Sequence, residues 1–377
     1  MGRAFLSFLA RVFLRQKTSR KPPPPLACLD REQVRKVLLI NATALGDLLF
    51  STPALRALRE TYPHWTLDLL VSPRFADLVR HHPAIRHLWL YPGRGPGLFR
   101  LGRELRRQGY DLAIILHGND PEATLLAHAS GAPFIIGSAR SPLSFVYSAA
   151  VPRSHPLEHA IEHRLNYVRL LGADTEDKHM EMFLPPEEEA RAEALLARHF
   201  GASASRLLAL HPTGSGAYKW WPLENFATLG TWLYQRYQAP LLIISGSRDR
   251  PVAEALAARL PGPTLVTGGR FSLLTVAALL KRARLLVAND SGPLHMALAL
   301  GVPTIALIGA DHPARIGPYQ VDWGIYLYKK DEVCQEERCL NHKCPNNRCM
   351  QAIEVKEAVR TIKSWWEKRV WEFNKIP

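Results

Sequence analysis

Residues 36–47 read KVLLINATALGD, and this stretch decides the fold class. The apolar run at 36–41 has the length of a buried strand, and residues 47–61 carry the apolar spacing of a helix. Strands alternating with helices predict a parallel, doubly wound α/β sheet, because parallel neighbours need a crossover between them. Further strands are predicted in this half at 66–71, 87–90, 111–116 and 133–136, with a helix at 98–108.

The same alternation restarts after residue 186. We therefore predict two Rossmann-like domains facing a central cleft. Ligands of open parallel sheets bind beyond the carboxyl ends of the strands, so the chemistry is expected in the loops that follow them. The predicted divisions are a basic amphipathic leader with a Pro-rich spacer at 1–30, an N-terminal Rossmann-like domain at 31–180, a C-terminal Rossmann-like domain at 186–350 and a C-terminal helix at 351–377.

Composition narrows the class of partner. The chain has 377 residues, which exceeds what one core normally supports, and 47% of them are apolar, as in globular proteins. The net charge of +14 favours an anionic partner: nucleic acid, an anionic membrane or a phosphorylated substrate. Signatures of nucleic-acid-binding motifs are absent from the sequence, which disfavours the first of these.

The leader has the pattern of an interfacial helix. Its basic residues lie within Arg3–Lys21, no acidic residue precedes Asp30, and a Pro-rich spacer follows. This pattern predicts a helix on an anionic membrane leaflet, and a helix docked on the protein body fits equally well. Arg11 interrupts the apolar stretch, which argues against a signal peptide. One helical face carries Phe5, Phe8, Leu9, Val12 and Phe13.

Five cysteines are too few for a secreted disulfide scaffold in a chain of this length, so a reducing compartment is favoured. Four of them have four residues between successive cysteines, whereas structural zinc sites usually contain closer pairs. Free thiols or a labile disulfide are therefore favoured over metal ligation, and their role stays open. These four are Cys334, Cys339, Cys344 and Cys349.

Two loops supply the candidate catalytic groups. In the loop after the first strand, Gly46 permits a tight turn and the Asp47 carboxylate could take a proton from an acceptor hydroxyl. The alternative is that Asp47 caps the next helix. In the loop HPTGSGAYKWWP at 211–222, the Lys219 ammonium could neutralise a diphosphate, and the alternative is a solvated surface lysine. Phosphate-binding donors in that loop are Thr213, Gly214 and Ser215.

Two further loops follow predicted strands of the second half. Residues 289–295 read NDSGPLH and place Ser291 and Gly292 at a helix start, where free N–H groups favour an anion. Asp290 and His295 could bond to sugar or phosphate, although each alone also fits a structural role. In SGSRD at 245–249 the nucleotide-binding candidates are Gly246 and Asp249, and Asp249 fits a helix cap equally well.

A basic stretch at 94–107 is the candidate acceptor surface. Its arginines alternate with apolar residues, so it could bind acceptor phosphates or a membrane. The interpretation as a solvated helix face is slightly favoured. The predicted acceptor-binding residues are Thr43, Arg94 and Arg103.

Together these loops resemble glycosyltransferase family 9, the ADP-heptose:lipopolysaccharide heptosyltransferases, from about Lys36 to the end of the chain. The matching segments are Leu45–Leu55, Lys219–Pro222, Asp290–His295 leading into Ala299–Thr304, and Cys344–Met350 with Ile353. Ser291 stands where several members carry threonine, and the long basic leader departs from the family pattern.

The resemblance implies a GT-B fold and inverting, metal-independent transfer without a cofactor. It implies that Asp47 is the general base and that Lys219 stabilises the departing diphosphate. It also implies that Asp290, Ser291, Gly292 and His295 hold the donor.

We therefore expect a glycosyltransferase that moves a sugar, heptose by the resemblance, from an ADP-sugar to a lipopolysaccharide core or lipid A-linked acceptor. It is expected on the inner face of the inner membrane, as a peripheral cytoplasmic protein with no nucleic-acid partner. Two other interpretations stay open: a nucleotide-sugar epimerase or hydrolase on the same scaffold, and a non-enzymatic, anion-binding membrane-surface protein. The donor sugar, the base, the acceptor position and the oligomeric state are not fixed by the sequence.

Overall fold

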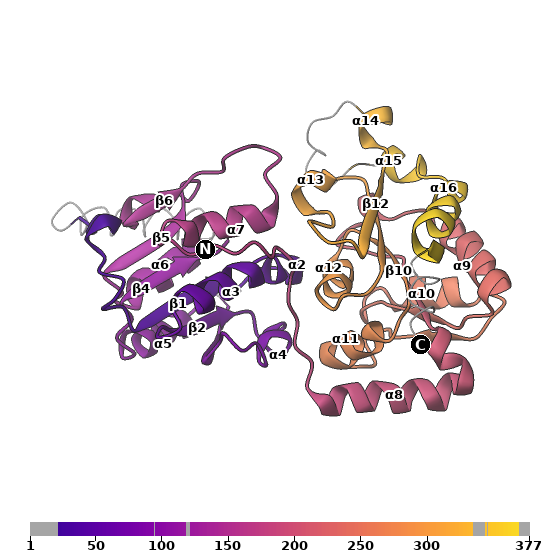
Figure 1. Cartoon of the computed structure of the whole chain (residues 1–377), viewed down its shortest axis with the longest axis horizontal. Helices are drawn as coiled ribbons and strands as arrows, with labels where there is room; N and C mark the ends of the chain where they lie inside the picture. Colours follow the sequence, from indigo (N-terminus) through magenta and orange to yellow (C-terminus); the bar gives the residue numbers. More distant parts are fainter. Residues whose placement is uncertain (1–21, 94, 118–120, 335–343, 345, 369–377) are drawn as a thin grey trace. The chain divides into compact units, whose positions relative to one another are not determined.

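A computed structural model describes residues 22–93, 95–117, 121–334, 344 and 346–368. The predicted leader helix, Arg94 and Cys339 therefore lie outside the described residues. The chain divides into two compact units, Met1–Lys178 and His179–Pro377 (Figure 1). Among the described residues, the structure contains no helix with the length and apolar character needed to cross a membrane.

The first unit is built on a six-stranded parallel sheet in the order β3-β2-β1-β4-β5-β6. The central strands are buried almost throughout, which explains their near-continuous apolar sequences. The strands are β1 (Lys36–Asn41), β2 (Thr66–Val71), β3 (His87–Leu90), β4 (Leu112–Ile115), β5 (Phe134–Ser138) and β6 (Ala149–Val151).

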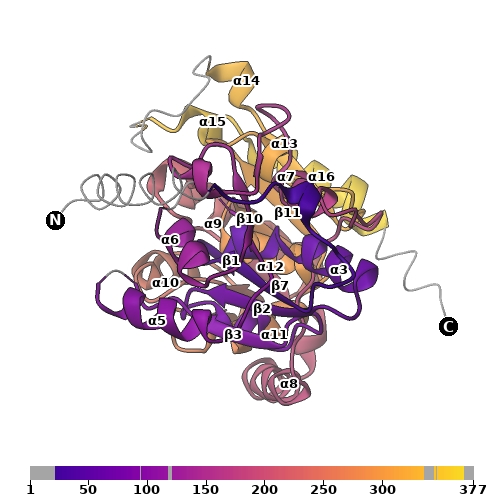
Figure 2. The same cartoon turned by 90° about the vertical axis from the view of Figure 1, so that its left-hand side faces the viewer.

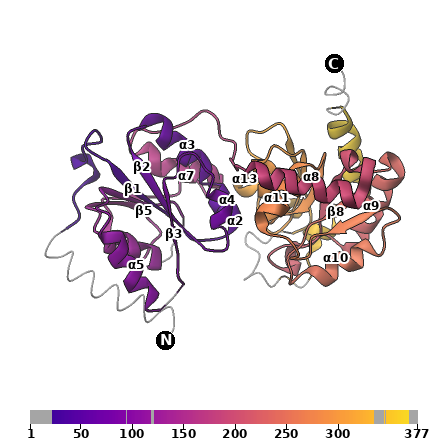
Figure 3. The ribbon, with the colours of Figure 1, turned by 90° about the horizontal axis from the view of Figure 1, so that it is seen from below.

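Helices cover both faces of this sheet. Figure 3 shows α3 and α7 on one face and α5 on the other, where α5 packs against α6. Figure 2 shows the same sheet and helices in a view turned by 90° about the vertical axis. The helices are α2 (Leu45–Leu49), α3 (Thr52–Thr61), α4 (Ala76–Val79), α5 (Gly97–Arg106), α6 (Pro121–Ala129) and α7 (Ala160–Arg169).

The helix predicted at 47–61 is wrong in its bounds, because the segment forms two helices, α2 and α3. Pro53 lies in the first turn of α3. Proline has no N–H to give and its ring clashes with the preceding turn, so α2 cannot continue through it. The break leaves α2 as a short helix that carries Asp47 in its first turn.

The second unit repeats the architecture with the sheet order β12-β11-β10-β7-β8-β9, again all parallel. Its strands are β7 (Leu208–His211), β8 (Leu241–Ile243), β9 (Thr264–Val266), β10 (Leu286–Asn289), β11 (Thr304–Ile308) and β12 (Gly324–Tyr328). Its helices are α8 (Pro186–Phe200), α9 (Leu223–Tyr237), α10 (Arg250–Ala257), α11 (Leu273–Lys281), α12 (Gly292–Ala299), α13 (Pro313–Ile316), α14 (Lys330–Val333), α15 (Arg348–Gln351) and α16 (Val355–Thr361).

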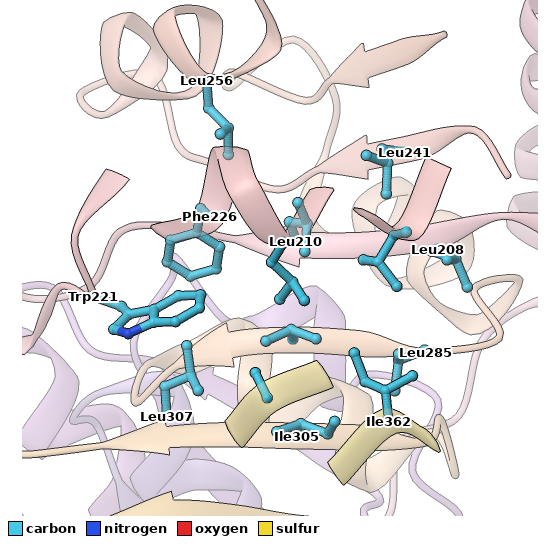
Figure 4. Close-up of a cluster of buried hydrophobic side chains, with 14 of the residues drawn as sticks. Leu208, Leu210, Trp221, Phe226, Leu241, Leu256, Leu285, Ile305, Leu307 and Ile362 are labelled. Atoms are coloured by element: carbon cyan, nitrogen blue, oxygen red, sulfur yellow. The ribbon is translucent and has the colours of Figure 1, made fainter. Parts of the chain in front are cut away.

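A large core holds the second unit together and includes the C-terminal segment. Trp221 and Phe226 are fully buried and meet edge to face, with ring centroids 5.0 Å apart (Figure 4). The Trp221 indole N–H donates to the carbonyl of Ile353 at 2.8 Å. Burial of a side chain such as Phe226 contributes about 1.5–3 kcal/mol, so this region also anchors the loop that begins at His211.

The predicted fold class is confirmed, since each unit is Rossmann-like. In each sheet the chain moves outward in one direction and then crosses to the other side of its first strand. The two strands that flank this topological switch point are β1 and β4 in the first unit, and β7 and β10 in the second. Ligand sites of open α/β sheets form outside the carboxyl ends of such strands.

Candidate active site

The loop after β1 is held by Asn41, a buried side chain at the end of the strand. The Asn41 amide donates to the carbonyl of Asp47 at 2.9 Å and to the hydroxyl of Ser51 at 2.8 Å. Its carbonyl oxygen accepts from the hydroxyl of Thr43 at 2.8 Å. The backbone of Asp47 is therefore fixed from the end of β1, and Thr43 belongs to the same hydrogen-bonded loop.

The carboxylate of Asp47 is paired with an arginine that sequence reasoning missed. Oδ1 of Asp47 lies 2.8 Å from Nη2 of Arg164, which comes from α7. The aspartate side chain is 41% exposed, whereas that of Arg164 is 6% exposed. The capping alternative for Asp47 is not what the structure shows, because the N-cap positions of α2 and α3 are Ala44 and Ser51.

His117 follows β4, across the switch point from the loop of Asp47. Burial, and then the charge of Arg164, lower the pKa of His117 to about 4, while the charge of Asp47 opposes the shift. The imidazole is therefore neutral at pH 7. In the first unit a half-exposed carboxylate thus lies beside a fixed guanidinium and a neutral imidazole, an arrangement suited to accept a proton.

The loop after β7 is fixed on two sides by asparagine side chains. Asn289, buried at the end of β10, accepts from the N–H of Trp221 at 3.0 Å and donates to the carbonyl of Pro212 at 2.8 Å. The amide of Asn347 donates to the carbonyls of Ala217 and Trp220, at 3.2 and 2.8 Å. The short 3₁₀ turn Ala217–Lys219 is held between these contacts, so the position of Lys219 is well determined.

Lys219 is ion-paired with two carboxylates and is not a solvated surface lysine. Its ammonium lies 2.5 Å from Oδ2 of Asp290, which follows β10, and 3.4 Å from Oδ2 of Asp311, which follows β11. Arg315 contacts the other oxygen of Asp311 at 3.5 Å. Burial alone would lower the pKa of Lys219, but the charge of Asp290 and then that of Asp311 raise it.

The carboxyl of Asp290 is ionised at all ordinary pH values. Burial alone would raise its pKa, but His295 and Lys219 outweigh burial and bring the pKa down to about 2. Nε2 of His295 lies 3.7 Å from Oδ1 of Asp290. The predicted residues Lys219, Asp290 and His295 are therefore brought together, with Asp311 as a fourth member that sequence reasoning did not identify.

Three buried polar atoms at the same sheet edge have no hydrogen-bond partner within the described parts of the chain. They are Nε2 of His211, Oγ1 of Thr213 and Oγ of Ser245. Buried polar atoms in folded proteins are nearly always bonded, so such a group indicates where a polar ligand binds. His211 is neutral at pH 7, because burial lowers its pKa to about 4 against the opposing hydrogen bond to the carbonyl of Ile244.

The start of α12 supplies backbone donors next to this cluster. Ser291 is the N-cap residue and makes no side-chain capping bond, because its hydroxyl donates to the carbonyl of Asn289 at 3.3 Å. The N–H of Gly292 keeps its capacity for an anion, whereas Pro293 has no N–H and that of Leu294 donates to the carbonyl of Ser291 at 3.1 Å. Gly214 lies close to the backbone of Asp290. A Cβ atom at Gly214 would lie 3.5 Å from the carbonyl oxygen of Asp290.

The remaining predicted donor and acceptor residues lie farther out along the sheets. Gly246 is exposed after β8, and Asp249 occupies the N-cap position of α10 without a side-chain capping bond. Ser215 is exposed in the loop of Lys219. Arg103 is exposed on α5, which follows β3, and β2 separates β3 from β1.

Among the described residues, no three His, Cys, Asp or Glu side chains gather closely enough to hold a metal ion. Cys334 and Cys344 are half-buried. Cys349 is buried and, with Met350, packs against Gly309, where a Cβ atom would meet their sulfur atoms at 2.8 and 2.4 Å.

Two Rossmann-like units, one with a carboxylate held by an arginine and one with a lysine held beside a helix start, match the architecture of GT-B transferases. Residues 98–345 match the sequence model of glycosyltransferase family 9 (heptosyltransferase), and the chain belongs to that family. It is therefore a glycosyltransferase.

Known relatives agree with this assignment. The chain is 29% identical to lipopolysaccharide heptosyltransferase 1 of Pseudomonas aeruginosa, over 75% of this chain and 81% of that protein. Its fold is similar to that of a family 9 glycosyltransferase from Veillonella parvula, with a TM-score of 0.78, 23% identity, and 89% and 97% of the two chains covered. For ADP-heptose LPS heptosyltransferase II of Escherichia coli the TM-score is 0.74, the identity 18%, and the coverage 89% and 99%.

Proposed function

We propose that the protein transfers a heptose from ADP-heptose to a lipopolysaccharide core acceptor. The observation that carries the proposal is the pair of side-chain clusters at the two topological switch points. Asp47 lies at the first and Lys219 with Asp290 at the second. The substrate class comes from relatives that are named as lipopolysaccharide heptosyltransferases.

In the proposed mechanism, Asp47 acts as the general base. Its carboxylate accepts the proton of the attacking acceptor hydroxyl, and the hydroxyl oxygen forms a bond to the anomeric carbon of the donor. The bond between that carbon and the diphosphate oxygen breaks, and ADP leaves with the electron pair. Attack from the face opposite the diphosphate inverts the anomeric configuration. A positioned base of this kind typically contributes about 10²–10⁴-fold in rate.

The second unit stabilises the charge that develops on the leaving diphosphate. Lys219 supplies the ammonium, and the start of α12 supplies the N–H of Gly292. Asp290 and Asp311 hold the ammonium in place. The diphosphate then accepts from the N–H donor of the ammonium that these two carboxylates do not use. The unpartnered hydroxyls of Thr213 and Ser245 donate to the nucleotide or its phosphates. Protein cations and N–H groups then provide the neutralisation that a metal ion provides in other transferases.

The acceptor is assigned to the first unit. Thr43 lies in the loop of Asp47, and Arg103 belongs to an exposed arginine-rich face on α5. Phe99 on the same helix is 77% exposed. An exposed aromatic side chain among arginines is typical of a surface that meets an anionic membrane, which fits a lipid-linked acceptor and a peripheral location on the cytoplasmic side. Arg94 and the leader, both outside the described residues, stay part of this proposal.

The experiment that tests the proposal compares the wild type with Asp47→Asn. ADP release is measured with ADP-heptose and a deacylated lipid A-linked core saccharide, with and without the acceptor. Asp77→Asn is the matched control, because Asp77 is an exposed aspartate on α4 of the same unit. We expect Asp47→Asn to lose at least about 10²-fold in turnover while the control keeps it. Wild-type turnover in Asp47→Asn, or full donor consumption without acceptor, contradicts the proposal.

A further inference from the structure

Three titratable or charged side chains from three separate elements meet at the switch point of the first sheet. Asp47 comes from the start of α2 after β1, His117 follows β4, and Arg164 comes from α7. The charged partner, Arg164, is almost entirely buried, whereas the Asp47 carboxylate is 41% exposed. The pair therefore presents a carboxylate outward from a guanidinium that solvent barely reaches.

This arrangement is poorly suited to stability alone. Burial of a guanidinium is costly unless its donors are satisfied, and a partly satisfied buried network is less stable than apolar packing. Nε of Arg164 and Nε2 of His117 are both buried with no hydrogen-bond partner among the described residues. Groups of this kind in a folded protein call for an explanation other than packing, and their position beside Asp47 supplies one.

We propose that Arg164 is a positioning residue for Asp47: it fixes Oδ1 of the carboxylate and leaves Oδ2 for the proton of the acceptor hydroxyl. This inference rests on the proposed function. The contact joins a single nitrogen, Nη2, to a single oxygen, Oδ1, at 2.8 Å. One such bond limits rotation of the carboxylate without occupying its second oxygen. Misplacement of a reacting group by about 1 Å costs on the order of 10²-fold in rate, which sets the scale of the expected effect.

Arg164 is the charged partner of Asp47 in this cluster. His117 adds no positive charge there, because its imidazole is neutral above about pH 4. The neighbour of Arg164 on α7, His163, faces Glu158 instead, with Nδ1 3.1 Å from Oε2. The orientation of the Asp47 carboxylate therefore depends on Arg164.

The test measures kcat and KM at pH 7 for Arg164→Gln and Arg164→Lys in the full chain. We expect Arg164→Gln to lower kcat by about 10²-fold, with a smaller change in KM for ADP-heptose. Arg164→Lys keeps a positive charge but not the planar guanidinium, so it is expected to restore only part of kcat.

Arg56→Gln is the matched control. Arg56 is an equally buried arginine of the same unit, on α3, and it donates to the carbonyl of Asp177 at 2.6 Å. Its loss is expected to lower the thermal unfolding midpoint and to leave kcat at the wild-type value. The proposal is overturned if Arg164→Gln keeps the wild-type kcat, or if it lowers only the unfolding midpoint as Arg56→Gln does.

Should Arg164→Gln fail to fold, the Arg164→Lys variant decides. A wild-type kcat in Arg164→Lys overturns the positioning role, since a lysine cannot reproduce the geometry of the guanidinium. A different result shows that the proposed function itself is wrong. In that case Asp47→Asn retains activity, whatever the Arg164 variants do.

Discussion

The ion pair between Lys219 and Asp290 gives a prediction whose size follows from its burial. Both side chains are largely buried, and Asp311 provides a second contact to the ammonium at 3.4 Å. Asp290→Asn keeps the shape of the side chain and removes its charge. Breaking a buried pair in this way costs about 3–5 kcal/mol, and because Asp311 keeps part of the attraction we expect about 3 kcal/mol in the free energy of unfolding.

The pH dependence of this loss has a definite sign. In the folded protein the pKa of Asp290 is about 2, whereas in an unfolded chain the pKa of an aspartate is about 3.9. The folded value is the lower one, so the stabilisation is complete above about pH 4 and is lost as the pH falls toward 2. The difference between wild type and Asp290→Asn should therefore be constant near neutral pH and shrink below pH 4.

Urea unfolding followed by tryptophan fluorescence measures this effect, since Trp220 and Trp221 lie in the same unit. The matched control is Glu224→Gln, which breaks the exposed ion pair with Arg259 at 2.7 Å and should cost much less, because solvent screens an exposed pair. The reasoning is refuted if Asp290→Asn costs no more than this control, or if its cost is the same at pH 3 and pH 7.

Three further predictions concern other parts of the chain. Thr213→Val removes a buried hydroxyl that has no partner among the described residues, so it should raise the unfolding midpoint of the free protein slightly. It should also weaken ADP binding about tenfold in calorimetry. Unchanged ADP affinity contradicts the assignment of that hydroxyl to the ligand. Because His211 is buried and neutral, the free energy of unfolding should fall as the pH drops from about 6.5 to 4. His211→Gln should reduce this fall in urea titrations at pH 7 and 4.5. An equal fall in the variant contradicts the role given to His211. Phe99→Ala with Arg103→Glu should lower sedimentation with phosphatidylglycerol vesicles relative to Arg191→Glu on α8, and equal sedimentation excludes the α5 face.

The sequence was sufficient for the fold because the strands that flank both switch points are buried on both faces. Such strands read as continuous apolar runs, as in KVLLIN at 36–41. The strands that were not predicted, β6 with the sequence AAV and β12 with the sequence GIYLY, lie at the sheet edges and are partly exposed. Edge strands carry a weaker signal because only part of each strand is buried.

The site residues that could be predicted are those that directly follow a strand in the sequence. Lys219, Asp290 and His295 come from loops after β7 and β10, and the structure brings them together. Arg164 gave no such signal, because it lies within a helix far along the chain and its contact with Asp47 exists only in three dimensions. Asp311 follows β11 in the same way as Asp290 follows β10, so its position after a strand was a signal that went unused.

The two ion pairs of Lys219 change how its role toward the donor diphosphate is understood. A lysine in a Gly-rich loop suggested a free cation, but the structure places its ammonium between two carboxylates. Its positive charge is therefore held in one place before the donor arrives. Electrostatic stabilisation in enzymes depends on this kind of prior placement, because no reorganisation is then needed during the reaction.

The most direct measurement for the whole account is a product analysis with ADP-heptose and a deacylated lipid A-linked core acceptor. The account predicts that ADP and glycosylated acceptor appear in equal amounts, that neither forms without acceptor, and that NMR shows an inverted anomeric configuration in the product. Donor turnover without acceptor, or a product that retains the donor configuration, would contradict it.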